Sequence, residues 1–173
     1  LAQDRCEGLS LACGIITNIT CDHTDYHGSF ENYVQAKLQL MKDFEPAVKI
    51  INADCSVSVQ HIERDESVFT YGSKDSNIQI CVNQAAWDQL DITFTEANVT
   101  SQVSLQVTGE YQAYNLAAAC AAARCLQFPW EEISEALPHL TTPTGRAQVI
   151  RTPANIPVVV DYAHTPDAMS QVL

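Results

Sequence analysis

Two short apolar runs that each end in polar residues constrain the fold of this chain most strongly. Residues 13–18 (CGIITN) and residues 47–52 (AVKIIN) have the composition of buried strands. Between them, Ser29 is a suitable N-cap for a helix over residues 30–43. Strands that alternate with helices indicate an α/β fold, in which the loops at the carboxyl ends of parallel strands bind ligands.

The pattern changes over residues 67–108. Short stretches rich in Val, Ile, Thr and Phe alternate there with polar residues: SVFTYG, NIQICV, DITFTEA and VSLQVTG. This alternation predicts a small antiparallel sheet or meander with one face in water.

The last third of the chain contains further helices and one more strand. An alanine-rich helix is expected over residues 115–126, and a second helix, entered through Pro129, over residues 130–140. Residues 157–161 (PVVVD) predict a buried strand, and residues 166–173 a helix. The polar segment 141–146 (TTPTGR) is the best candidate for a domain boundary.

Charge and composition exclude several classes of protein. Nine basic residues against twenty-one acidic ones give a net charge of -12, which disfavours nucleic acid or an anionic membrane surface as a partner. An anionic substrate is still possible, because a few Arg or Lys side chains can bind phosphate locally. No apolar run approaches the roughly 20 residues that span a bilayer. The seven cysteines form no CxxC pair, which predicts reduced thiols and a cytoplasmic protein.

Both ends of the chain are expected to be cuts in a longer polypeptide. The chain begins at Leu1 without a starting Met, and it ends at Leu173 inside an expected helix. Such cuts would expose apolar surface, which favours self-association.

The first group of candidate site residues follows the strand at residues 13–18. Asp22, His23, Asp25 and His27 lie within six residues, and carboxylate and imidazole groups together hold divalent metals or perform acid–base chemistry. On spacing alone, a solvated polar turn is the favoured interpretation.

Lys37 is the second candidate, because helical spacing places it on one stripe with Phe30, Tyr33 and either Leu40 or Met41. A lysine on an apolar stripe is unfavourable unless it reaches the edge of the stripe, is paired or is chemically changed. The spacing does not separate these possibilities.

Three further candidates lie in the second half. The segment GEYQAYN (residues 109–115) leads into the alanine-rich helix, where Asn115 could bind a base edge, although capping of the helix is favoured by propensity. Arg146 follows Gly145 in the polar segment. Asp161 ends a strand and could accept hydrogen bonds from ribose. The 173 residues contain no G-x-x-x-x-G-K-[ST] phosphate loop.

Together these segments resemble the Mur ligase family. TNITCDHTDYHG (residues 17–28) resembles its motif T-N-x-x-x-D-H-x-D, and Ala36-Lys37 follows at the spacing of the family's carbamylated lysine. Residues 109–115 resemble G-x-F-N-x-x-N, and Gly145-Arg146 resembles G-R-x-E. DYAHTPD (residues 161–167) is similar to the signature of the muramoyl-dipeptide branch, and LAQDR at the start is similar to its substrate segment. The resemblance covers essentially the whole chain.

The resemblance implies a fold and a domain division. Residues 1–143 would be the later half of the central ATPase domain, with a parallel sheet, helices and a small antiparallel sheet. Residues 144–173 would begin the Rossmann-like C-terminal domain. Because the phosphate loop is absent from these residues, the 173-residue chain alone is expected to be inactive.

The resemblance also implies a reaction and its residues. ATP and Mg²⁺ would be the cofactors, and the third amino acid, diaminopimelate or L-lysine, would be added to UDP-N-acetylmuramoyl-L-alanyl-D-glutamate through an acyl-phosphate. His23 and carbamylated Lys37 would be the catalytic Mg²⁺ ligands. The remaining roles would be substrate binding by Gln3 and Arg5, and ATP binding by Asn115, Arg146 and Asp161.

Two departures and two alternatives accompany this assignment. Gln112 replaces the first Asn of N-x-x-N, and Gln148 replaces the Glu of G-R-x-E. Folylpolyglutamate synthase also has T-N-x-x-x-D-H-T, but the segments YHG and DYAHTP argue against it. A non-catalytic module of the same fold is the alternative from another class. The choice between diaminopimelate and lysine is open.

Overall fold

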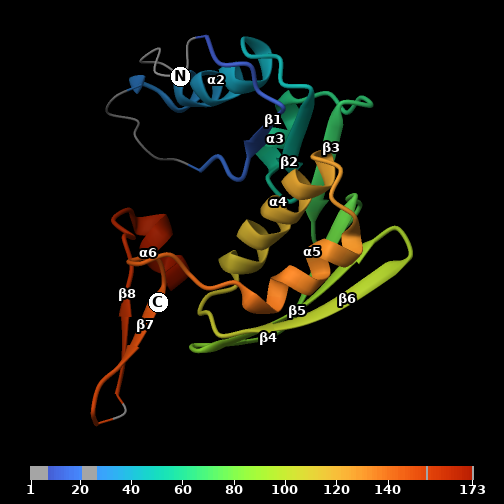
Figure 1. Cartoon of the computed structure of the whole chain (residues 1–173). Coiled ribbons are helices and arrows are strands. Elements are labelled where there is room, and N and C mark those ends of the chain that lie inside the picture. Colours follow the sequence, from blue (N-terminus) through green and yellow to red (C-terminus); the bar gives the residue numbers. More distant parts are fainter. Residues whose placement is uncertain (1–7, 21–26, 155, 173) are drawn as a thin grey trace.

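The structure is a computed structural model that describes residues 8–20, 27–154 and 156–172. Its main feature is a six-stranded mixed sheet in the order β1-β2-β3-β4-β5-β6 (Figure 1). Strands β1 to β4 run parallel, whereas β4, β5 and β6 form an antiparallel meander. The strands are β1 (Cys13–Ile16), β2 (Val48–Asn52), β3 (Val68–Gly72), β4 (Ile78–Ala86), β5 (Gln89–Glu96) and β6 (Val99–Leu105).

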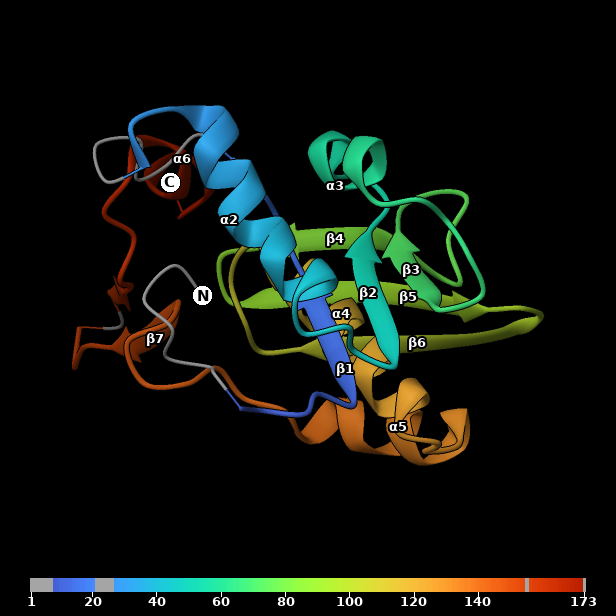
Figure 2. The ribbon, with the colours of Figure 1, turned by 90° about the horizontal axis from the view of Figure 1, so that it is seen from above.

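Helices lie on both faces of the sheet (Figure 2). One face carries α2 (Phe30–Lys42) and α3 (Ser56–His61); the other carries α4 (Tyr111–Cys125) and α5 (Trp130–Ala136), which the 3₁₀ turn Leu137–His139 extends. Successive side chains of a strand point to opposite faces, so Ile50 packs toward α4 and its neighbour Ile51 toward α2. This arrangement confirms the α/β prediction.

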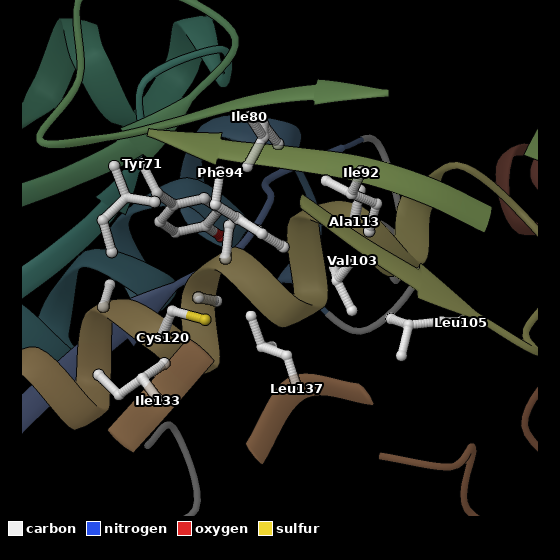
Figure 3. Close-up of a cluster of buried hydrophobic side chains, with 14 of the residues drawn as sticks. Tyr71, Ile80, Ile92, Phe94, Val103, Leu105, Ala113, Cys120, Ile133 and Leu137 are labelled. Carbon is white, nitrogen blue, oxygen red and sulfur yellow. The ribbon is translucent and has the colours of Figure 1, made fainter. Parts of the chain in front are cut away.

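The larger core lies between the sheet and α4. Tyr71, Phe94, Ile92 and Val103 point from the strands toward the alanines and Cys120 of α4, with Ile133 and Leu137 behind (Figure 3). Alanine has the smallest apolar side chain, so α4 approaches the strands closely, and Ala113, Ala117 and Ala121 are fully buried.

The assignment of residues 67–72 to the antiparallel sheet was wrong. Strand β3 pairs in parallel with β2, with Ile50 opposite Phe69 and Ile51 opposite Thr70. The short helix α3 provides the crossover between the two strands, and the meander continues the same sheet beyond β3. Alternating polarity predicts a half-exposed strand but does not reveal the direction of its neighbour.

The predicted strand at residues 157–161 exists but is not buried. Within the described part of the chain, strand β8 (Pro157–Val160) pairs only with β7 (Gln148–Arg151) in an antiparallel hairpin, followed by α6 (Pro166–Val172). Val158, Val159 and Val160 are 43%, 39% and 40% exposed. The hairpin projects from the main sheet (Figure 1), and a two-stranded sheet cannot cover its own faces.

Candidate functional site

A cavity of about 510 Å³ lies where the carboxyl ends of β1 and β2 face the start of α4. Its position follows from the topology, because parallel strands place the loops at their carboxyl ends on the same edge of the sheet. Polar side chains from three separate segments form most of the lining, which comprises Thr17, Asn18, Thr20, Asn52, Asp54, Cys55, Glu110, Tyr111, Tyr114 and Asn115.

Asp54 is the most extensively hydrogen-bonded side chain of this cavity. Its Oδ2 accepts hydrogen bonds from the Ser73 backbone N–H at 2.7 Å and from the Tyr114 hydroxyl at 2.9 Å, and its Oδ1 accepts one from Ser73 Oγ at 3.0 Å. Burial and the neighbouring Asp54 raise the pKa of Tyr114 to about 12. Asp54 therefore joins the ends of β2 and β3 to α4 in a fixed geometry.

Asn52 fixes the neighbouring backbone. The side chain is buried, donates from Nδ2 to the Thr17 carbonyl at 3.2 Å, and accepts the Asp54 N–H at 2.9 Å. It thereby links the segment after β1 to the segment after β2. Sequence reasoning did not single out Asn52, Asp54 or Tyr114, although the polar residues Asn52 and Asp54 at the end of a strand are the same kind of signal that drew attention to residues 20–28.

Asn115 lies on the cavity but does not cap a helix, so the capping interpretation was wrong. Helix α4 begins at Tyr111, which makes Asn115 its fifth residue, and the N-cap is Glu110. The Asn115 side chain is exposed and donates to Gln112 Oε1 at 3.2 Å. Its amide thus presents donor and acceptor groups to a ligand in the cavity.

The ring of Tyr111, the first residue of α4, folds back toward the preceding turn because Gly109 leaves room for it. Gly109 has φ of 91°, and a Cβ at this residue would lie 2.4 Å from the Tyr111 ring. Burial raises the pKa of Tyr111, the Asp161 carboxylate raises it further, and the Arg146 guanidinium lowers it. Both charged groups therefore lie near this part of the cavity wall.

Arg146 and Asp161, predicted separately, are neighbours in the structure. Asp161 accepts hydrogen bonds from the backbone N–H groups of Ala147 at 2.6 Å and Ala163 at 2.7 Å. The exposed Arg146 guanidinium lies over the Tyr162 ring at 4.9 Å. The pairing of β7 with β8, which places Gln148 opposite Val160, brings the two segments together.

Lys37 lies at the edge of the buried stripe of α2, not within it. The buried side chains of the helix are Tyr33, Val34, Leu38 and Met41, whereas Lys37 and Phe30 are exposed. Lys37 Nζ lies 5.3 Å from the Tyr33 ring centre, and the His27 ring contacts the same tyrosine at 5.4 Å. Ser29 caps α2 by accepting the Asn32 N–H at 3.2 Å, as predicted.

Several predicted site residues lie outside the described part of the chain: Gln3, Arg5, Asp22, His23 and Asp25. Among residues 8–20, 27–154 and 156–172, no three His, Cys, Asp or Glu side chains cluster as a metal site. Over the same residues, no helix is both long enough and apolar enough to cross a membrane.

Comparison with known proteins relates the chain to one family. The model of the Mur ligase middle domain matches residues 1–123. UDP-N-acetylmuramoyl-L-alanyl-D-glutamate–2,6-diaminopimelate ligases of Clostridium acetobutylicum and Bacteroides thetaiotaomicron are 31% and 35% identical over all of this chain, which spans 36% of their length.

Solved structures share the fold. A UDP-N-acetylmuramoyl-L-alanyl-D-glutamate–2,6-diaminopimelate ligase superposes with a TM-score of 0.77 at 29% identity, over 99% of this chain and 36% of that one. The MurF ligase from Thermotoga maritima in complex with ADP superposes with a TM-score of 0.83 at 19% identity, over 96% and 39% of the two chains.

Proposed function

Because this chain belongs to the Mur ligase family, we propose that it is part of a cytoplasmic ATP-dependent ligase of peptidoglycan synthesis. The reaction would add the third amino acid, diaminopimelate or L-lysine, to UDP-N-acetylmuramoyl-L-alanyl-D-glutamate through an acyl-phosphate. The names of the relatives from Clostridium acetobutylicum and Bacteroides thetaiotaomicron support the choice of acceptor.

The observation that carries the proposal is the cavity between the ends of β1 and β2 and the start of α4. Residues of two motifs line it together, Thr17 and Asn18 from the motif at residues 17–28 and Asn115 from the motif at residues 109–115. The cavity lies at the edge of the sheet where α/β proteins bind ligands. Asn115 would bind adenine through its exposed amide. Arg146 and Asp161 would complete the nucleotide site beyond Tyr111.

The charge of the cavity bears on the form of the nucleotide. The carboxylates of Asp54 and Glu110 both line it, and two fixed negative charges repel a bare triphosphate. A bound divalent cation reduces this repulsion, so ATP would enter as its Mg²⁺ complex.

His23 and Lys37 would hold Mg²⁺, with the lysine carbamylated. An unmodified ammonium cannot ligate a metal, whereas a carbamate presents oxygen ligands that Mg²⁺ prefers. The exposed position of Lys37 is compatible with modification, and its amine lies beside the Tyr33 ring, which also contacts the His27 ring. When bound, the metal would neutralise charge that develops during phosphoryl transfer.

The remaining assignments concern substrate binding, the domain division and the activity of the chain by itself. Gln3 and Arg5 would bind the UDP-muramoyl-dipeptide. Residues 1–143 would belong to the central domain and residues 144–173 to the C-terminal domain. Because no phosphate loop occurs in these 173 residues, the chain alone would neither ligate nor hydrolyse ATP.

The test is a ligation assay with the full-length protein, Mg²⁺ and ATP. The expected result is an ADP-forming reaction between the UDP-muramoyl-dipeptide and either diaminopimelate or L-lysine, with the product identified by mass spectrometry. Glutamate addition to a folate would support the folylpolyglutamate synthase alternative. Absence of any ADP-forming reaction would support a non-catalytic module.

Lys37→Ala tests the metal assignment. We expect a loss of ligation of at least 100-fold, because removal of one charge-stabilising group at a phosphoryl-transfer site typically costs that much, and added bicarbonate should not restore it. Lys42→Ala is the matched control, since Lys42 lies on the same helix and its amine donates to Gln35 Oε1. Normal turnover by the Lys37 variant would refute the assignment.

A further inference from the structure

The turn that presents Arg146 has an unusual backbone. Gly145 and Ala147, on either side of the arginine, have φ of 72° and 46°. Glycine adopts this left-handed region freely, but alanine does so only when the surroundings hold it there. Ala147 is also buried, at 1% exposure, so the residue after Arg146 is anchored in the interior.

Two side chains hold this turn through its backbone N–H groups. Gln148 Oε1 accepts the N–H of Gly145 at 3.0 Å. Asp161 Oδ2 accepts the N–H of Ala147 at 2.6 Å, while its Oδ1 accepts the N–H of Ala163 at 2.7 Å. Hydrogen bonds to an ionised carboxylate are stronger than those between neutral groups, so Asp161 is the stronger of the two anchors.

The arginine side chain is supported as well. Its guanidinium lies 4.9 Å from the centre of the Tyr162 ring, and that ring contacts His164 edge to face at the same centroid separation of 4.9 Å. A planar guanidinium stacks favourably on an aromatic face. Arg146 is thus exposed to solvent, but the ring of Tyr162 restricts the direction of its side chain.

We propose that Asp161 and Gln148 are positioning residues that hold the left-handed Gly145–Ala147 turn, so that Arg146 presents its guanidinium to the nucleotide. This inference rests on the proposed nucleotide role of Arg146. Both oxygens of Asp161 accept backbone N–H groups, which fixes the carboxylate against the turn and lets it act on the nucleotide through Arg146, while each oxygen keeps a second lone pair for a ribose hydroxyl. Gln148 provides the second anchor without adding a negative charge beside the phosphates.

The experiment is a double-mutant cycle in the full-length ligase, with the Michaelis constant for ATP and kcat measured separately. Arg146→Ala and Asp161→Asn should each raise the Michaelis constant roughly tenfold, as the loss of one charged contact does. The double variant should show an increase well below the roughly 100-fold product of the two single effects, because coupled residues are not additive. Asp88→Asn is the matched control: Asp88 pairs with Arg151 at the far end of β7 and should leave the constant unchanged.

The outcomes separate the inference from the proposed function. An increase of roughly 100-fold in the double variant would mean that Asp161 acts independently of Arg146, which overturns the inference alone. An unchanged Michaelis constant in Arg146→Ala would refute the nucleotide role of Arg146 and the inference with it.

A second variant covers the case in which Asp161→Asn does not fold. Gln148→Leu removes the acceptor of the Gly145 N–H while leaving the carboxylate intact. It should raise the Michaelis constant for ATP severalfold in the presence of Arg146 and have no effect in the Arg146→Ala background. An equal effect in both backgrounds would overturn the inference.

Discussion

Two tyrosine hydroxyls near the cavity differ in whether they have a hydrogen-bond partner. Tyr71 is fully buried and its hydroxyl has no partner among the described residues, whereas the Tyr114 hydroxyl donates to Asp54. Leaving a buried polar group unpaired is unfavourable, so Tyr71→Phe should raise the free energy of unfolding by about 1 kcal/mol. Tyr114→Phe should lower it by about 1 kcal/mol, because Asp54 loses a donor. Urea unfolding measures both, and destabilisation by both variants would contradict this account.

Burial of groups that ionise at high pH predicts a loss of stability in alkali. Burial raises the pKa of Cys120 from 9.0 to about 12, and that of Tyr114 from 10.0 to about 12. The unfolded chain therefore loses these protons first, so their contribution to stability is complete below about pH 9 and disappears as the pH approaches 12. Unfolding free energies measured from pH 8 to 11 should fall more steeply in the wild type than in the Tyr114→Phe variant. Equal slopes would contradict the assignment.

Helix α4 depends on small side chains where it meets the sheet. Ala113, Ala117 and Ala121 are four residues apart and fully buried, so they share the face that packs against the strands. Ala117→Leu should lower the free energy of unfolding by about 1–3 kcal/mol, because an overfilled interface displaces its neighbours. Ala119→Leu is the control, since Ala119 is exposed on the same helix and should change stability by less than about 0.5 kcal/mol. Equal effects of the two changes, measured by urea unfolding, would refute this packing.

The elements that could be predicted are those with a strong local signal. Ser29 supplies a cap, and the run KII of β2 supplies an apolar strand, so α2 and β2 were found close to their observed limits. Helix α3 was missed, because SVSVQH is short and mixes β-branched with polar residues. Without that crossover, β3 could not be recognised as a parallel strand. The start of α4 was placed four residues late, since its first turn carries Tyr111, Gln112 and Tyr114 and only one alanine.

At the scale of the whole molecule, the cavity was predictable in part. The rule that parallel strands share a carboxyl edge brings residues 17–20 together with the segment after β2, and this needs only the strand order. The contact of Asp161 with the turn of Arg146 was not predictable. It depends on the register of β7 with β8, and local sequence patterns do not specify which residues of two strands face each other.

The central claim is that the cavity between the ends of β1 and β2 and the start of α4 binds the nucleotide. Photolabelling of the full-length ligase with 8-azido-ATP and Mg²⁺, followed by peptide mapping, tests this most directly. The account predicts that the label attaches to the peptide that contains residues 109–116, that excess ATP prevents labelling, and that Asn115→Leu reduces it roughly tenfold. Label on the peptide of the β4–β5 turn at residues 86–89, with none on residues 109–116, would contradict the claim.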